Sequence, residues 1–103
     1  MTIVQDYLDY TKQYKEKYGE KTLVLIQVGS FYEVYALKDN DGNITGSDIE
    51  IFSRINDLLI ATKTNMKCNK KTVLMAGFGL LYLDKYIKRL QNAGYTIIVI
   101  NQD

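Results

Sequence analysis

The sequence predicts a single α/β domain, with a mixed β-sheet of about four to six strands flanked by about three helices. The chain has 103 residues, which suffices for one hydrophobic core but not for two. Segments with helical spacing of apolar residues alternate with short, nearly continuous apolar segments. Apolar residues make up 47% of the chain and charged residues 24%, as in ordinary globular proteins.

The first half of the chain predicts a helix, two strands and a turn. Residues 4–18 carry apolar and aromatic side chains at three- and four-residue spacings, which predicts an amphipathic helix that ends at Gly19. Residues 23–28 form a nearly continuous apolar run, which predicts a strand buried on both faces. Residues 31–37 are rich in aromatic and β-branched residues and predict a second strand. The Asp, Asn and Gly residues of 39–43 favour a turn.

The middle of the chain predicts a second helix and a polar loop. Ser47 or Asp48 is expected to cap a helix that continues to about residue 59. Its apolar face is expected to consist of four residues, Ile51, Ile55, Leu58 and Leu59. Residues 63–71 have no apolar pattern and predict a loop. This loop contains four lysines, Lys63, Lys67, Lys70 and Lys71.

The last third of the chain predicts a strand, a helix and a strand. Residues 73–76 form an apolar strand, which Gly77 and Gly79 are expected to end. Residues 80–93 return to helical spacing and end at Gly94. Residues 95–100 form the final strand. The two glycines lack the third glycine of a dinucleotide-binding loop, so a Rossmann site is not expected.

Charge and residue types exclude several classes of function. The net charge is +1, so binding to a polyanion has to come from a local patch. No segment is long and apolar enough for a membrane span, and the first residues do not resemble a signal peptide, so an intracellular setting is expected. With Cys68 as the only cysteine and no histidine, an internal disulfide and a Ser-His nucleophile are excluded.

The acidic residues allow two further hypotheses. A calcium loop would use Asp39, Asp41, Asn43 and Glu50, but Ile44 occupies the position where such a loop needs glycine. A magnesium-dependent nuclease would need convergent carboxylates beside a lysine such as Lys63. Its candidates are Asp39, Asp41, Asp48, Glu50 and Asp57. Their spacing does not bring them together, so a small α/β nuclease is a minor alternative.

The segment GSFYEVY, residues 29–35, combines a glycine, a ring and a carboxylate. Because side chains alternate along a strand, Phe31 and Glu33 are expected on one face, just after a turn at Gly29. A ring exposed there can wedge between base steps in a minor groove, with the carboxylate bonded to a base edge. The lysines of residues 63–71 can follow a phosphate backbone. The alternative is that Phe31 and Glu33 only serve the core, and in that case the structure should bury both side chains.

These residues resemble the N-terminal mismatch-recognition domain, domain I, of the MutS family of DNA mismatch-repair proteins. The similarity continues in order from about residue 7 to residue 102, through the segments LVLIQVG, GSFYE, LIATK, LMAGFG and LQNAGYTIIVINQ. Two departures mark a divergent member. Ser30 stands where the family has an acidic residue, and Gly79-Leu80-Leu81 stands where it has Pro-Tyr-His.

The resemblance implies a function for the exposed pair. Phe31 is similar to the residue that stacks on a mismatched or unpaired base, and Glu33 to the residue that hydrogen-bonds to it. Contacts with the phosphate backbone of the DNA are implied for four lysines, Lys63, Lys67, Lys70 and Lys71. The partner would be double-stranded DNA with mismatches or small loops.

The resemblance also implies what surrounds this domain. Residues 1–103 would be a single non-catalytic domain without a cofactor, at the N-terminus of a longer, dimeric, DNA-dependent ATPase that uses ATP and magnesium elsewhere. The protein would be intracellular and associated with DNA. The main alternative is a structural or interaction domain of a MutS paralogue that no longer reads DNA.

Overall fold

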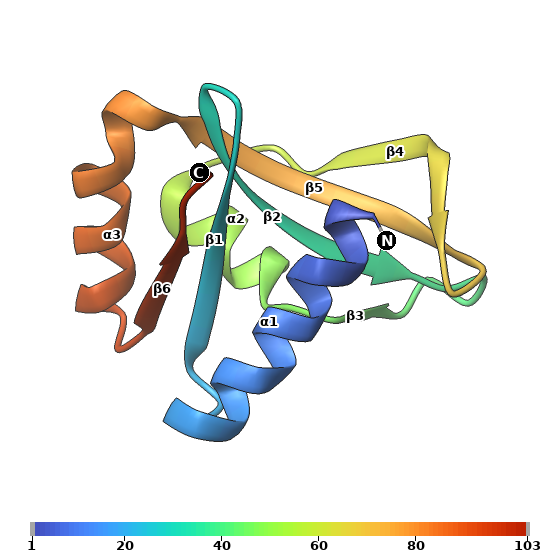
Figure 1. Cartoon of the computed structure of the whole chain (residues 1–103), viewed down its shortest axis with the longest axis horizontal. Helices are drawn as coiled ribbons and strands as arrows, with labels where there is room; N and C mark the ends of the chain where they lie inside the picture. Colours follow the sequence, from blue (N-terminus) through green and yellow to red (C-terminus); the bar gives the residue numbers. More distant parts are fainter. Residues whose placement is uncertain (1, 103) are drawn as a thin grey trace.

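The computed structural model describes residues 2–102, which form three α-helices, one short 3-10 helix and a six-stranded mixed sheet (Figure 1). The elements, in chain order, are α1 (Ile3–Tyr18), β1 (Thr22–Val28), β2 (Phe31–Lys38), β3 (Ile44–Thr45), α2 (Ile49–Asn56), β4 (Ala61–Cys68), β5 (Lys71–Gly79), the 3-10 helix η1 (Leu80–Tyr82), α3 (Leu83–Asn92) and β6 (Thr96–Ile100). The predicted α/β class is confirmed.

The sheet has the strand order β4-β5-β2-β1-β6, and β3 pairs with the end of β2. β1 and β6 are parallel, and the other pairs are antiparallel. β2 and β5 pair along their whole length, from Phe31 opposite Gly79 to Lys38 opposite Thr72. β1 pairs with β2 only over residues 26–28, and the two strands diverge beyond them (Figure 1).

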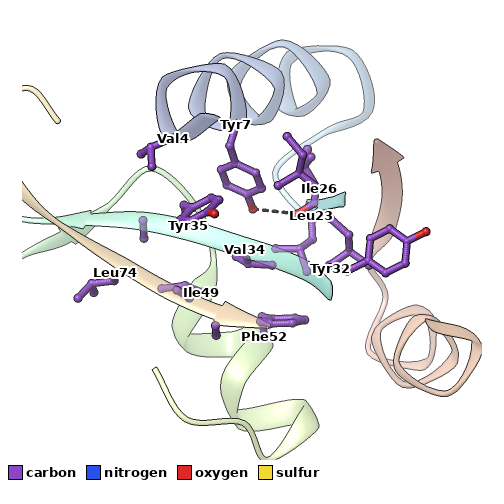
Figure 2. Packing of buried hydrophobic residues seen from close by; sticks show 14 of the residues in the cluster. Val4, Tyr7, Leu23, Ile26, Tyr32, Val34, Tyr35, Ile49, Phe52 and Leu74 are labelled. Carbon is purple, nitrogen blue, oxygen red and sulfur yellow. Dashed lines mark hydrogen bonds between the residues drawn. The ribbon is translucent and has the colours of Figure 1, made fainter. Parts of the chain in front are cut away.

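The helices cover the sheet on both faces. Tyr7 of α1 lies against Tyr35 of β2 on one face (Figure 2). On the other face, Phe52 of α2 packs against Phe78 of β5, and Phe78 also contacts Tyr86 of α3. The core therefore consists of two apolar layers separated by the sheet.

Helix α1 forms where the sequence predicts it. The Thr2 hydroxyl accepts a hydrogen bond from the backbone N–H of Gln5, which caps the first turn. Gly19 ends the helix with a φ of 109°, a conformation that suits glycine. The predicted strands at residues 23–28, 31–37 and 95–100 are also confirmed, each within one residue at either end.

Tyr7 fills the gap where β1 and β2 diverge. Its hydroxyl donates to the carbonyl oxygen of Val24 over 2.9 Å, and its side chain is fully buried (Figure 2). Its ring meets that of Tyr35 edge-on, with a centroid distance of 5.6 Å. One side chain of α1 thus bonds to β1 and packs on β2.

The predicted loop at residues 63–71 is wrong, because most of this segment is strand. It forms β4 and the start of β5, joined by a two-residue turn in which Asn69 and Lys70 have φ angles of 53° and 65°. Such a pair of left-handed residues is typical of a tight hairpin. β4 is an edge strand, and edge strands often carry lysines instead of an apolar pattern, so its sequence gives no strand signal.

The second helix is shorter than predicted, and its most buried residues differ from the predicted ones. It ends at Asn56, because Asp57 adopts a left-handed conformation with a φ of 54°. Ile49 and Phe52 are buried. Of the four predicted residues, Ile55 and Leu58 pack partly buried against the core, whereas Ile51 is exposed and Leu59 lies beyond the helix. The predicted face and the face that contains Phe52 both have helical spacing in the sequence. The contact of Phe52 with Phe78 of β5 determines which of the two is buried.

The cap of α2 also differs from the prediction. Asp48 occupies the N-cap position, but its side chain makes no capping hydrogen bond. Its carboxylate instead pairs with Lys15 and accepts a hydrogen bond from the Tyr95 hydroxyl, which ties α1 and the residue before β6 to this segment.

We predict that Tyr7→Phe lowers the free energy of unfolding by about 1–2 kcal/mol, because the Val24 carbonyl loses its buried donor. Chemical denaturation of the two proteins measures the difference. Tyr18→Phe is the matched control, since Tyr18 lies in the same helix with half of its side chain exposed. Equal effects of the two substitutions would show that the Tyr7 hydroxyl has no special role.

Candidate nucleic-acid interface

The hairpin between β1 and β2 presents the GSFYE segment at one end of the sheet (Figure 1). Gly29 and Ser30 form its two-residue loop, and the φ of 60° at Gly29 suits the first position of such a loop. The loop is tied down on two sides. The N–H of Gly29 donates to the Gln102 side chain over 3.0 Å, and the N–H of Leu80 donates to the Ser30 carbonyl over 3.0 Å.

Phe31 and Glu33 lie on the same face of β2, next to this loop. Phe31 is 53% exposed and Glu33 is partly buried, whereas the intervening Tyr32 is buried on the opposite face. Phenylalanine is a residue type that folded proteins usually bury. An exposed ring beside an anchored turn is therefore available for contact with a partner.

A shallow hollow of about 280 Å³ lies beside the pair. Apolar side chains form most of its wall, and Glu33 supplies the acidic group. Its lining residues are Phe31, Glu33, Leu59, Ala61, Met75, Ala76 and Gly77. Leu59, which the sequence suggests is core, is 92% exposed at this hollow. The sequence did not predict Leu59 as a second exposed apolar residue of the site, because Leu59 lies just after α2 and not within the helix.

Gly77 makes room for Glu33. It lies opposite Glu33 in the register of β2 and β5 and within the strand, so the prediction that the strand ends at Gly77 is wrong, whereas Gly79 is its last residue, as predicted. A Cβ atom at Gly77 would lie 2.6 Å from the Tyr32 carbonyl oxygen and 3.2 Å from Cγ of Glu33. The Glu33 side chain therefore extends across β5 at the position where that strand has no side chain.

The carboxylate of Glu33 has a partner within its own strand. Oε1 accepts a hydrogen bond from the hydroxyl of Tyr35, which is almost fully buried. Burial, together with the hydrogen bond to Glu33, raises the pKa of the Tyr35 hydroxyl well above its ordinary value, so the hydroxyl stays protonated as a donor. Tyr35 follows Glu33 by two residues, so the alternation of side chains along a strand would have placed both on the same face.

The four lysines do not gather around Phe31. Lys63 and Lys67 lie on β4, Lys70 lies in the turn, and Lys71 begins β5. Lys71 and Gly79 are at opposite ends of β5, a separation of about 26 Å for a strand of this length. Of these four lysines, Lys63 is the nearest along β4 to the hollow, two residues after Ala61 of its lining.

The acidic residues considered for metal binding have separate structural roles. Asp39 closes the turn at residues 39–43, where it accepts hydrogen bonds from the N–H groups of Asp41 and Asn43. These bonds, that of Asn43 foremost, lower the pKa of Asp39. Asp48 pairs with Lys15. Within residues 2–102, no three acidic, Cys or His side chains are grouped to hold a metal ion, and no helix is long and apolar enough to cross a membrane.

Comparison with known proteins identifies one family. Residues 3–103 match the sequence model of the family described as MutS domain I. A DNA mismatch repair mutS homolog of Acanthamoeba polyphaga mimivirus is 28% identical over 98% of this chain and 9% of its own length. A mitochondrial DNA mismatch repair mutS homolog of Sarcophyton glaucum is 26% identical over 97% and 12%. The DNA mismatch repair protein MutS of a Dehalococcoides mccartyi strain is 31% identical over 95% and 9%. The chain therefore spans only 9–12% of the length of these relatives.

Gly77→Ala is expected to lower the free energy of unfolding by about 1–3 kcal/mol, because the added methyl group overlaps the Tyr32 carbonyl. Gly79→Ala is the matched control in the same strand. Its Cβ would meet only the Tyr82 ring, at 3.8 Å, and its φ of −68° suits any residue, so a change within about 0.5 kcal/mol is expected. Thermal or chemical denaturation measures both variants. Similar stabilities of the two would contradict the close approach of the Tyr32 carbonyl to Gly77.

Proposed function

The chain belongs to the MutS domain I family, and from this premise we propose that it recognises mismatched or unpaired bases in double-stranded DNA, in the service of mismatch repair. The exposed Phe31 ring is the observation that carries the proposal. A ring that served only to fill the core would be buried, as Tyr32 is on the opposite face of β2. The relatives named above are DNA mismatch repair proteins, which supports the same assignment.

Phe31 acts as a wedge that tests how easily the duplex deforms. Inserting a ring between base steps from the minor groove unstacks them and kinks the DNA. A mismatched or unpaired base is already poorly stacked, so the deformation costs less there, by a margin of about a few kcal/mol. Specificity then comes from deformation energy. The anchored Gly29-Ser30 loop gives the wedge a firm support.

Glu33 supplies a hydrogen bond to the base that Phe31 contacts. The two residues share one hollow, so a base stacked on the ring lies within the neighbourhood of the carboxylate. Phosphates repel a carboxylate, and this repulsion grows as the charges approach. The position of Glu33 against the surface of β5, above Gly77, keeps its charge at the sheet and away from the phosphates.

The lysine-rich hairpin of β4 and β5 supplies the contacts with the phosphate backbone of the DNA. Lys63, Lys67, Lys70 and Lys71 follow this hairpin away from the hollow. Its length of about 26 Å matches roughly eight base pairs of duplex, so the lysines can meet phosphates several steps from the wedge. Contacts of this kind hold the register without reading sequence.

The domain itself performs no chemistry and holds no cofactor in this proposal. Residues 1–103 form the N-terminal domain of a longer, dimeric, DNA-dependent ATPase, whose ATP and magnesium are bound elsewhere. The support is that the relatives are roughly ten times longer than this chain, which spans 9–12% of them. The protein is accordingly intracellular and acts at DNA.

We predict that Phe31→Ala removes discrimination between mismatched and fully paired duplexes in the full-length protein, because the wedge is lost. The ratio of the two affinities, measured by fluorescence anisotropy, should fall to about 1. Tyr18→Ala removes an aromatic side chain of similar exposure from the far end of α1 and should leave the ratio unchanged. Discrimination that survives in Phe31→Ala would refute the proposed function.

Glu33→Gln is expected to keep duplex binding and to change discrimination by about threefold or more. The substitution removes the repelled charge, and it replaces a group that only accepts hydrogen bonds by one that also donates. Glu50→Gln makes the same chemical change at an exposed position on α2, beyond the opposite face of the sheet. If Glu33→Gln behaves like Glu50→Gln in both affinities, Glu33 does not contact the base.

A further inference from the structure

One hydrogen bond connects the base-reading carboxylate to the hydrophobic core. The hydroxyl of Tyr35 donates to Oε1 of Glu33, two residues earlier in β2. We propose that Tyr35 is a positioning residue, whose hydroxyl orients the Glu33 carboxylate for its contact with the base. This inference rests on the proposed function, and it adds a residue that determines how well mismatches are distinguished.

Tyr35 is held rigidly enough to orient a partner. Its side chain is only 4% exposed, and its ring meets Tyr7 edge-on at 5.6 Å. Tyr7 is fixed in turn by its hydrogen bond to the Val24 carbonyl. The backbone carbonyl of Tyr35 accepts a hydrogen bond from the Ser47 hydroxyl over 2.6 Å. Ring and backbone are therefore both constrained, and the hydroxyl has a defined position.

The bond leaves one oxygen of Glu33 for the DNA. Within residues 2–102, no other hydrogen bond or ion pair reaches this carboxylate, so Oε2 is the oxygen left for a base edge. A glutamate side chain without the bond would sample several rotamers, and DNA binding would then lose conformational entropy by ordering it. With the bond, that ordering is complete before DNA arrives.

Tyr35→Phe isolates the contribution of the hydroxyl, because phenylalanine keeps the ring that packs on Tyr7. In the full-length protein, the ratio of mismatched to paired affinity should fall about threefold to tenfold, the range that one ordinary hydrogen bond covers. Affinity for the fully paired duplex should not change. An unchanged ratio would overturn the inference. An increased ratio would overturn it as well, because it would mean that the hydrogen bond to Tyr35 keeps Glu33 away from the DNA.

Tyr32→Phe is the matched control. It removes a hydroxyl from the residue that precedes Glu33 in the same strand, where Tyr32 bonds to the Asn101 side chain over 2.6 Å. That hydroxyl lies on the opposite face of β2 and does not touch Glu33, so the affinity ratio should stay the same. A fall equal to that of Tyr35→Phe would show a general loss of strand order and would overturn the inference.

A double-mutant cycle with Glu33→Ala separates positioning from structure. If Tyr35 acts through Glu33, Tyr35→Phe has no further effect on the ratio once Glu33 is alanine. A second fall in that background would overturn the inference. Phe31→Ala, measured alongside, distinguishes the two proposals. If Phe31→Ala loses discrimination while Tyr35→Phe keeps the affinity ratio of the unsubstituted protein, only the inference about Tyr35 is refuted. If Phe31→Ala keeps its discrimination, the proposed function is refuted.

The unsubstituted chain provides a test that does not depend on how a variant folds. The hydroxyl proton of an almost fully buried tyrosine, when it is held in a hydrogen bond, exchanges more slowly with water than that of an exposed tyrosine and can be observed by NMR. The Tyr35 hydroxyl proton should give such a resonance, with a nuclear Overhauser effect to the Cγ protons of Glu33. Rapid exchange of this proton in the free chain would overturn the inference.

Discussion

The hydrogen bond from the Tyr7 hydroxyl to the Val24 carbonyl is the constraint on which the rest of the domain depends. β1 and β2 pair over only three residues on each strand, so most of the seam between them has no backbone ladder. The side chain of Tyr7 closes this seam from α1, and its ring packs on Tyr35. A buried carbonyl without a donor would cost about 1–3 kcal/mol, which explains why a polar group is present at the centre of an apolar layer.

The same packing extends to the surface where DNA is proposed to bind. Tyr7 supports Tyr35, and Tyr35 bonds to Glu33, so the carboxylate is linked to the core through two aromatic residues. The tip of the hairpin is held independently by Gln102 and Leu80. A wedge that bends DNA works against an elastic cost of about 1–6 kcal/mol, and only a rigid support can transmit such a load. The position of Phe31 and Glu33 beside a turn that is held from two sides fits this requirement.

Much of the fold was predictable because its signals are local. The spacing of apolar residues in α1, the continuous apolar run of β1 and the glycine before Phe31 each depend on a few neighbouring residues. Three features were not predictable in this way. β4 has no apolar alternation, α2 has two faces of comparable spacing, and Gly77 resembles a strand terminator although it lies within β5.

The sequence by itself determined that Phe31 and Glu33 share a face and follow a tight turn, because alternation along a strand and the freedom of glycine are properties of the chain alone. Tertiary structure decided what surrounds them. Pairing with β5 turned a lysine-rich segment into a strand, and the absence of a side chain at Gly77 made space for Glu33. Burial of Tyr35 against Tyr7 then aimed its hydroxyl at that carboxylate. Periodicity indicates which residues favour burial, but not which strand or helix will lie next to them, and that depends on the packing of the whole core.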